Sequence, residues 1–572
     1  MRATGLAATF VVCGSSVIAQ TAIDDAAAQA AAIERERSQQ QVESPLRAPS
    51  GVRPQPPVPA RTLDGQTCID VDTVDVRDVT LIPLNRIEEL VAPFEAQCLG
   101  LAEINSVLEA VTFAYVETGY VAARAFLPEQ DLSDGTLKVV VVEGKLEAIV
   151  MNRDEQSLRG QRATAFPAMI GEPVNLRDIE QGLDQLSRLR SVDATMQIAA
   201  GAEQGGSILA VSREAGRPWH GSLSFNDLGS ASTGEFQTRL SLGFDDLLGL
   251  NDTIAFSYQR SMDDHPLAFS NDRPNGDTWT AKFEVPYGYW TFAIDGDRNA
   301  YRSEIEGALG PIETSGNSST AGLTASRVLH RDQISKTTLT GTLTAKETES
   351  FILGSRVDVS SRRLSIFDFD ISHSRQVWGG QGSGSISVSR GLDIWGALDD
   401  GEAADGSPRA QFTKYDLSVG YSRDFMAATQ PVNYDARLTA QWSDDLLFGS
   451  EQISLGGDSS VRGSESSLMF GNRGVMLRNE FAAPLNAFSD PAYARTFGQL
   501  VPYFAFDLGR IAPQPSFDIA GGTLSGAAFG LRSQGGRLAF DISYADILSQ
   551  PTDLPENGPE TGVFAASLTI TF

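Results

Sequence analysis

Few residues in this sequence are of the types that perform chemistry, and none of them is arranged as a known catalytic constellation. The 572 residues include four histidines and three cysteines, which is little material for a zinc or an iron–sulfur site. No Gly-x-Ser-x-Gly motif and no defensible carboxylate–histidine spacing accompanies the histidines. We therefore expect no catalytic residues, no metal and no cofactor. The histidines are interpreted as strand-end or loop residues: His220, His265, His330 and His373.

Two cysteines form the remaining candidate for covalent chemistry. Residues 1–19 carry Arg2 at their start, continue with a mostly apolar stretch and end in small residues, which predicts an export signal. The alternative is a disordered N-terminus. Removal of the signal takes Cys13 away and leaves Cys68 and Cys98. In an exported protein such an isolated pair is expected to form one disulfide. Closing a loop of ~30 residues would stabilise the fold by roughly 3–4 kcal/mol, and the alternative is two buried free thiols.

Composition narrows the class of protein. The chain carries 45 Lys and Arg against 73 Asp and Glu, a formal net charge of −28. A surface this acidic repels phosphate backbones, so no nucleic-acid partner is expected. Hydrophobic residues make up 41% of the chain, enough to build cores. No apolar run beyond residues 1–20 approaches ~18 residues, which excludes a helical membrane protein.

The segment after the signal predicts a tethered helix. Residues 22–41, within the range 20–42, are helix formers without Pro or Gly. Their face is mostly Ala, too small to bury much area, so we expect a peripheral helix or one that fills a polar cavity. Residues 43–66 are rich in proline and predict a semi-rigid extended linker. A helix on such a linker can leave a site and return to it.

Two small α/β modules are predicted next, over 67–145 and 146–214. Neither contains a nucleotide or metal motif, so both are interpreted as binding or docking modules. Asn175 is expected to cap a helix that begins at residue 176. The expected helices cover 84–94, 101–119 and 176–190, and the expected extended segments cover 120–127, 137–142, 146–151 and 207–211.

Periodicity changes to two in residues 215–572. In one of many such runs, Phe236, Leu240 and Phe244 alternate with polar residues. Strands of ~9–11 residues with aromatic ends, behind an export signal, fit a transmembrane antiparallel β-barrel with a wet, charged lumen. A soluble sandwich also alternates, but its strands are shorter.

The last strand supports closure of a barrel. In residues 562–572 the apolar residues share one face, and the sequence ends in an aromatic residue, as a closing outer-membrane strand commonly does. The alternative is an ordinary amphipathic edge strand. The residues expected on this face include Phe564, Leu568, Ile570 and Phe572.

Five segments together carry a resemblance to one family. They appear in the family's order, behind the helix and linker, and the resemblance covers nearly the whole chain. The sequence resembles the two-partner secretion transporters, the haemolysin-activator type of outer-membrane polypeptide exporter. The segments are CLGLAEINSVLEAVTFAYVETGYVAARAFLPEQDLSDGTLKVVVVEG (98–144), FNDLGSASTGEFQ (225–237), DDLLGLND (245–252), EQISLGGDSSVRG (451–463) and GNRGVMLRNE (471–480).

The resemblance implies an architecture and a function. It implies a plug helix, two periplasmic polypeptide-transport-associated (POTRA) domains and a barrel of about sixteen strands in the outer membrane of a Gram-negative bacterium. The expected partners are one secreted polypeptide, a large β-helical adhesin or haemolysin, together with outer-membrane lipid and the barrel assembly machinery. The alternatives are a passive porin, which leaves the modules unexplained, an outer-membrane hydrolase and an assembly factor for other barrels.

The resemblance also implies a contact inside the barrel. The sixth loop should fold into the lumen with Val461, Arg462 and Gly463 at its tip. In the wider superfamily this arginine pairs with an aspartate in a strand that reads D-x-G, and the candidates here are Asp507 and Gly509. The alternative is that Arg462 is one more lumen charge.

The residues support this pairing, with two departures from the family pattern. Asp507 is opposite in phase to Phe506 and Leu508, so it should point to the lumen, where a guanidinium fork can bind its carboxylate with two nitrogens. Ser464 stands where the family usually has an aromatic residue, and Ala505 where the superfamily often has Phe.

Overall fold

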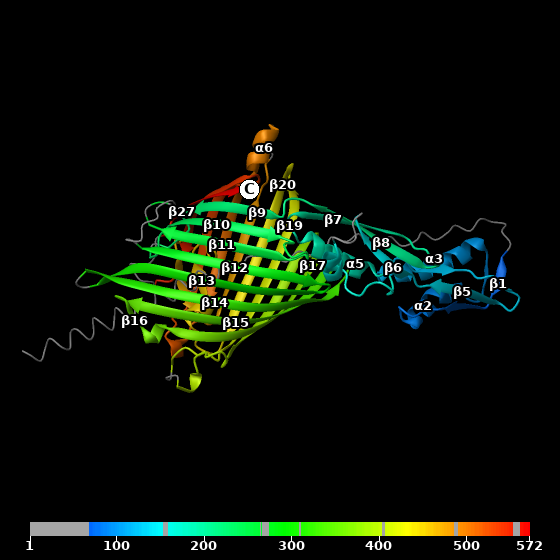
Figure 1. The fold of residues 1–572 in the computed structure, drawn as a ribbon, viewed down its shortest axis with the longest axis horizontal. Helices are drawn as coiled ribbons and strands as arrows, with labels where there is room; N and C mark the ends of the chain where they lie inside the picture. Colours follow the sequence, from blue (N-terminus) through cyan, green and yellow to red (C-terminus); the bar gives the residue numbers. More distant parts are fainter. Residues whose placement is uncertain are drawn as a thin grey trace, which may run out of the picture.

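The computed structural model describes residues 68–572, except for 153–157, 231, 264, 266–273, 308–309, 403–405, 486–489 and 553–560. The predicted export signal, plug helix and proline-rich linker therefore lie outside the described residues. Two small α/β modules stand end to end beside a large barrel (Figure 1). None of the described helices is long and apolar enough to cross a membrane.

The first module packs one long helix on a small mixed sheet. Its three-stranded sheet has the order β2-β5-β4, and β1 pairs with β3 beside it. Val107, Val111 and Tyr115 of α3 are fully buried, together with Leu137 and Val139 of β5, and form the core. The elements are β1 Ile69–Val71, β2 Thr73–Arg77, α2 Leu84–Val91, η1 Ala92–Phe94, β3 Gln97–Leu99, α3 Leu101–Glu117, β4 Arg124–Phe126 and β5 Thr136–Val142.

The second module repeats this plan with its own core. Its sheet has the order β6-β8-β7, with β6 parallel and β7 antiparallel to β8. Asn175 caps α5 by accepting a hydrogen bond from the amide of Arg177, at 2.8 Å. Ile179 and Leu186 of α5 are fully buried. The elements are β6 Lys145–Met151, α4 Arg159–Ala165, α5 Leu176–Ser187, β7 Val192–Ala200 and β8 Gly206–Ala215.

Sixteen long strands among the described residues close into an antiparallel barrel, which confirms the predicted fold class. Each strand pairs with the next, and β27 pairs with β9 to close the barrel. The strands are β9 Trp219–Asn226, β10 Phe236–Asp245, β11 Thr253–Met262, β12 Asn275–Tyr287, β13 Trp290–Gly307, β14 Gly310–Arg331, β15 Ser335–Ile352, β17 Arg362–Val377, β18 Gly380–Leu392, β19 Thr413–Ala427, β20 Gln430–Ser443, β23 Gly474–Ala482, β24 Gly498–Ile511, β25 Gly522–Gly535, β26 Leu538–Ser549 and β27 Val563–Thr571.

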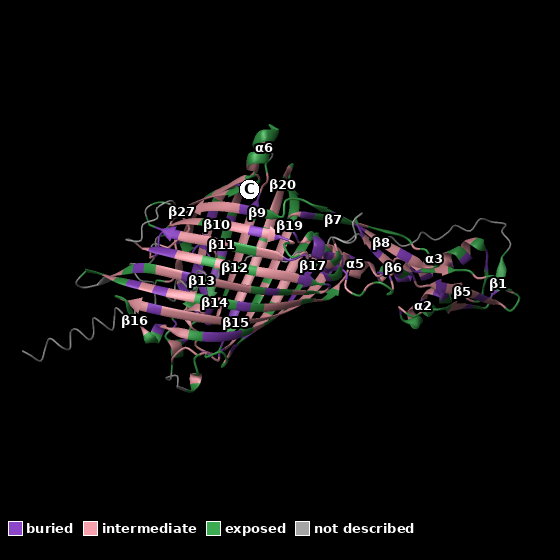
Figure 2. Cartoon of the chain, viewed as in Figure 1, coloured by how far each residue is buried: buried purple, intermediate pink, exposed green. Residues whose placement is uncertain are grey.

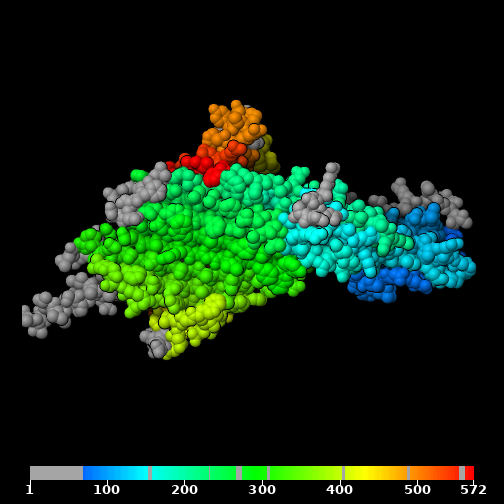
Figure 3. Space-filling view, in the orientation of Figure 1, coloured from blue at the N-terminus to red at the C-terminus, as the bar shows by residue number. Residues whose placement is uncertain are grey.

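Several short helices and one short strand lie in the connections between these strands. The two-residue β16, Ser355–Arg356, pairs with the end of β15. The helix α6, Pro491–Phe497, lies between β23 and β24 and projects from the barrel body (Figure 3). The remaining short helices are η2 Asp358–Ser360, η3 Asp400–Glu402, η4 Gly449–Glu451 and η5 Pro515–Phe517.

Burial alternates along the barrel strands, as a lipid-facing and a lumen-facing side require (Figure 2). In β24, Phe504, Phe506 and Leu508 are exposed, whereas Ala505 and Asp507 are fully buried. Several strands are longer than the expected ~9–11 residues, which suffice for a tilted crossing of the bilayer. β13, β14 and β15 have 18, 22 and 18 residues, so the pairing of these strands continues beyond the hydrocarbon core of the bilayer.

The second module lies against one end of the barrel (Figure 3), where it contacts the turns that join β10 to β11 and β12 to β13. Buried Gln181 and Gln185 of α5 both donate to the carbonyl oxygen of Gly288, at 3.2 and 2.8 Å. Arg213 of β8 bridges to Asp246 in the turn between β10 and β11, at 2.6 Å. These bonds fix the second module against the barrel.

Candidate functional site

The connection from β20 to β23 folds back into the barrel. These residues, 444–473, are called loop six below; they contain the hairpin of β21, Ile453–Gly456, and β22, Ser467–Gly471. An apolar cluster joins the hairpin to the inner faces of β24 and β25. Its buried members are Ile453, Leu455, Val461, Met469, Ile511, Ile519 and Leu524.

The tip of loop six brings Arg462 and Asp507 together. The Nε and Nη2 of Arg462 donate to the two carboxylate oxygens of Asp507, at 2.7 and 2.9 Å. The backbone amide of Arg462 donates to the same carboxylate at 3.2 Å. The side chain of Asp507 is 0% exposed and that of Arg462 is 9% exposed. The contact is the two-pronged, charge-assisted geometry that binds a guanidinium to a carboxylate most strongly.

Glu480 of β23 completes the site and was missed from the sequence. Its Oε2 accepts from Nη1 of Arg462 at 3.0 Å, and its Oε1 accepts from Nη2 of Arg532 at 2.6 Å. Glu480 is out of phase with the exposed Val475 and Phe481 of the same strand. The alternation that pointed Asp507 to the lumen was therefore present for Glu480 as well, within the segment GNRGVMLRNE.

Glycines allow the loop to approach the wall this closely. A Cβ on Gly526 of β25 would lie 1.9 Å from the carbonyl oxygen of Arg462. A Cβ on Gly509 would lie 2.5 Å from Leu455 Cδ2. Gly463 has a φ of +124° and lies against the backbone of Asp546, a conformation that favours glycine. The predicted Gly463 and Gly509 thus lie in the site, and Gly526 was missed.

The two departures from the family pattern are both buried. Ser464 is 4% exposed; its hydroxyl accepts from the amide of Gly457 at 3.0 Å and donates to the carbonyl of Ser466 at 2.9 Å. Its backbone forms an isolated bridge with Thr561. Ala505 is directly opposite Glu480 in the ladder between β23 and β24. The small side chain of Ala505 therefore stands beside the carboxylate that Arg462 uses.

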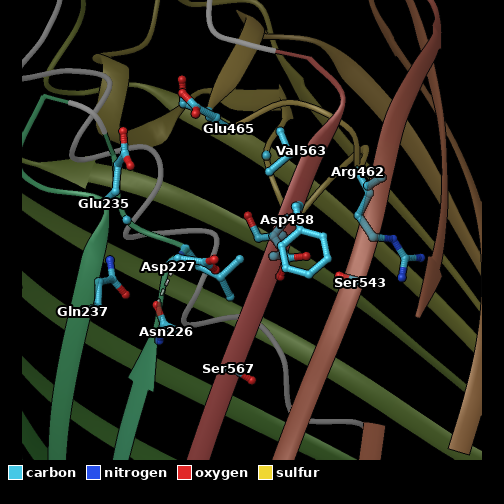
Figure 4. A pocket seen from close by; sticks show the side chains of 18 of the residues that line it. Asn226, Asp227, Glu235, Gln237, Asp458, Arg462, Glu465, Ser543, Val563 and Ser567 are labelled. Atoms are coloured by element: carbon cyan, nitrogen blue, oxygen red, sulfur yellow. Dashed lines mark hydrogen bonds between the residues drawn. The ribbon is translucent and has the colours of Figure 1, made fainter. Parts of the chain in front are cut away.

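A cavity of 490 Å³ separates the tip of loop six from the strands at the barrel seam. Figure 4 shows Asn226, Asp227 and Glu235 on one side of this cavity and Asp458 and Arg462 of loop six on the other. A second cavity, of 760 Å³, extends along the inner faces of β11 to β20. Loop six therefore divides the lumen.

The remaining predicted residues fall into two places. Cys68 and Cys98 form a disulfide in the first module, with their Cα atoms 5.3 Å apart. β27 carries Phe564, Leu568 and Ile570, with Phe572 directly after it. At the seam, β27 pairs with β9 from Ser567 to Thr571.

The histidines do not assemble with one another or with a metal site. Among the described residues, no group of three or more His, Cys, Asp or Glu side chains is placed to hold a metal ion. His220 and His330 lie near the ends of β9 and β14, whereas His373 lies inside β17 and contacts Thr337 at 2.9 Å. His373 thus differs from the strand-end or loop position expected of it.

Comparison with known proteins places the chain in one family. The profile of the haemolysin secretion/activation protein ShlB/FhaC/HecB matches residues 205–533. The profile of the ShlB-type POTRA domain matches residues 69–144, and a further POTRA profile matches residues 145–200.

Individual relatives agree with this assignment. An outer membrane transporter CdiB of Dickeya dadantii is 33% identical over 88% of this chain and 87% of its own length. The hemolysin transporter protein ShlB of Serratia marcescens is 27% identical over 90% and 88%. The solved structure of CdiB from Escherichia coli has 30% identity and a TM-score of 0.82, and covers 99% of this chain and 100% of its own. The chain therefore belongs to the ShlB/FhaC/HecB haemolysin secretion/activation family, and it is a two-partner secretion transporter of the outer membrane rather than an enzyme.

Proposed function

We propose that this transporter receives one secreted polypeptide, unfolded, from the periplasm and passes it through the barrel, with loop six held in an export-competent position by Arg462 and Asp507. The observation that carries the proposal is the buried contact between these two residues. A passive porin needs an open lumen, whereas here a loop is fastened across it by charge-assisted hydrogen bonds.

The modules would recognise the partner through free strand edges. β4 and β7 are the outer strands of their sheets, and neither outer edge is paired with a described strand. Phe126 of β4 and Ile198 of β7 are exposed there. An extended chain can add to such an edge through backbone hydrogen bonds, with nearby apolar side chains giving selectivity. Folding of the partner at the cell surface would supply direction, since trapping what has emerged requires no nucleotide.

The finer assignments rest on the sequence. We propose an export signal in 1–19, a plug helix in 20–42 and a linker in 43–66, followed by POTRA domains over 67–145 and 146–214 and a barrel over 215–572. The partner is expected to be a large β-helical adhesin or haemolysin-like protein, because the relatives include haemolysin transporters. Outer-membrane lipid would cover the exposed apolar faces of the strands, and the barrel assembly machinery would insert the barrel.

Export by the whole chain tests the proposal. A large secreted β-helical protein, sought first among the neighbouring genes, is expressed with and without this chain in a Gram-negative host, and the amount of that protein in the medium is measured. Export that depends on the chain is the expected result. Free passage of small solutes without partner export would instead favour the porin.

A further inference from the structure

Loop six has a second buried ionic contact, at the end opposite its tip. Glu451 lies in η4, before β21, and its side chain is 5% exposed. Its Oε1 accepts from Nζ of Lys346 on β15 at 2.5 Å, and its Oε2 accepts from Nζ of Lys414 on β19 at 3.1 Å. Both oxygens of one buried carboxylate are therefore held by lysines from two strands of the wall.

Neighbouring groups of the loop are fastened to the same part of the wall. The carbonyl oxygen of Glu451 accepts from the side-chain amide of Gln441 on β20, at 3.0 Å. Leu447, two residues before η4 begins at Gly449, is 1% exposed. It packs in an apolar cluster with Leu364 and Ile366 of β17 and with Phe412 before β19. We call residues 447–452 the root of loop six.

The root and the tip are attached to different arcs of the barrel. The lysines of the root contact lie on β15 and β19, whereas Arg462 at the tip is bound by β23 and β24. In the order of the barrel, β24 follows β15 after β17, β18, β19, β20 and β23. Loop six therefore crosses the lumen and is bound to the wall at its root and at its tip.

The root also borders the larger cavity of the lumen. Lys346, Lys414 and Glu451 line the cavity of 760 Å³, together with Asp416 and Arg437 on the wall. A root that left the wall would enter this space. Holding the root in place keeps the cavity beside loop six open along β11 to β20.

We propose that Glu451 is a positioning residue for export, which holds the root of loop six against β15 and β19 through Lys346 and Lys414. The inference rests on the proposed function for its effect on export, but the attachment itself is a property of the transporter alone. Losing the carboxylate charge should free the root while the contact of Arg462 with Asp507 remains.

The first experiment measures whether the root is attached. A cysteine is introduced as Ser450→Cys in the purified full-length protein, and its reaction with a soluble maleimide is timed. Glu451→Gln, which keeps the size of the side chain and removes its charge, should raise the rate about tenfold or more, as expected from the loss of charge-assisted hydrogen bonds. Lys346→Met combined with Lys414→Met should have the same effect, and adding Glu451→Gln to that pair should raise the rate no further.

Two controls separate the root from the rest of the protein. Asp416→Asn removes the longer ion pair of Lys414, at 3.9 Å, but leaves both bonds of Glu451 in place, and should leave labelling at Ser450→Cys unchanged. A reporter at the buried tip, Ser464→Cys, should stay protected in Glu451→Gln. Heat-modifiable migration of each variant checks that the barrel has folded.

The second experiment measures partner export by Glu451→Gln, which should fall while Asp416→Asn exports normally. Unchanged labelling of the root in Glu451→Gln overturns the attachment, whatever export does. Increased labelling with normal export overturns the positioning role. If the unmodified chain exports no partner, the proposed function fails, and the labelling result still decides whether Glu451 holds the root.

Discussion

Asp507 of β24 and Gly526 of β25 stand directly opposite each other in the barrel ladder, and the tip of loop six lies over both. The carboxylate of Asp507 binds the side chain of Arg462, while the absence of a side chain at Gly526 leaves room for the carbonyl oxygen of the same arginine. This one pair of opposite residues thus provides both the charge that binds Arg462 and the space that its backbone occupies.

Removing either member of the buried ion pair should reduce export without unfolding the barrel. Breaking a buried pair by deleting one partner costs about 3–5 kcal/mol, which here weakens the attachment of loop six, while the wall keeps its ladder bonds. Arg462→Ala and Asp507→Ala should therefore both export poorly, and the double variant should be little worse than either, because all three lose the contact between Arg462 and Asp507. The measurement is partner protein in the medium, normalised to heat-modifiable barrel.

A lumen arginine that lines the 490 Å³ cavity opposite the tip, with no described hydrogen bond to loop six, provides the control for this pair. Arg239 of β10 donates to Gln259 of β11 at 2.7 Å, and Arg239→Ala should export normally. Normal export by both Arg462→Ala and Asp507→Ala, or losses that simply add, would contradict the functional pair.

A methyl group on Gly526 should displace the tip. Its Cβ would lie 1.9 Å from the carbonyl oxygen of Arg462, and relieving such overpacking costs about 1–3 kcal/mol. Gly526→Ala should therefore lower export to a level near that of Arg462→Ala. Gly341→Ala in β15 is the matched control, since its nearest neighbour, Phe367, is 3.8 Å away. Equal export by the two glycine variants would show that export does not depend on the close approach of the tip to Gly526.

The disulfide of the first module should stabilise that module and leave the barrel unaffected. Mass mapping without reductant should recover Cys68 and Cys98 in one linked peptide pair. Replacing both with alanine should destabilise the module by roughly 3–4 kcal/mol in the chain-entropy model, seen as faster proteolysis of the periplasmic region. Two thiols that react with an alkylating reagent in the mature protein would refute the linkage.

The stability of the first module should fall in acid through Glu143. Burial opposes its ionisation, but hydrogen bonds from the Thr80 hydroxyl and amide, the Tyr115 hydroxyl and the Leu81 amide outweigh burial and lower the pKa of Glu143. A carboxyl whose pKa is lowered by folding contributes stability above its unfolded-state pKa, and this is lost as pH falls through the folded-state pKa.

Glu143→Gln tests this contribution. At about pH 7 the variant should be digested faster in the first module than the unchanged protein, and the difference should shrink as the pH falls through the lowered folded-state pKa of Glu143, below which both side chains are neutral. A difference that does not depend on pH would mean that the carboxylate charge contributes nothing. Glu147→Gln on β6 of the second module serves as the control for charge loss.

Deleting residues 21–41 should raise single-channel conductance in planar bilayers. The reason is that an Ala-rich helix on a proline-rich tether is suited to filling a polar cavity rather than a core. Secretion need not stop when the helix is removed. Unchanged conductance would exclude the plug role.

The barrel was predictable because period-two alternation is a strong local signal, as in β10, where the pattern of Phe236–Phe244 matches the observed strand. The helix α5 was likewise marked by the cap at Asn175, and α3 begins at Leu101, the residue predicted for its start. The extended segment expected over 120–127 is strand only at Arg124–Phe126, since Tyr120 and Ala123 form turns through their amides. Local sequence could not show that the amide of Tyr120 bonds to the carbonyl of Tyr115 near the end of α3, or that the amide of Ala123 bonds to the carbonyl of Tyr120.

The site was only partly predictable, for a similar reason. Arg462 and Asp507 were found because a resemblance linked two distant segments. Glu480, Gly526 and Glu451 were missed, since nothing local says which strand a folded-in loop will touch. Their partners are set by barrel closure, which brings together residues separated by tens or hundreds of positions.

The attachment of the second module has a mechanical consequence. Its described bonds to the barrel include those to Asp246, Glu284 and Gly288, at the ends of β10 to β13 that face the module, and to Arg331 of β14. The tip of loop six is bound by the other half of the barrel, on β23 and β24. Force applied to the second module by an arriving polypeptide therefore acts first on one half of the cylinder. That force reaches the tip of loop six by two routes. One is the sliding of neighbouring barrel strands past each other, and the other is loop six itself, which is bound to both halves of the barrel.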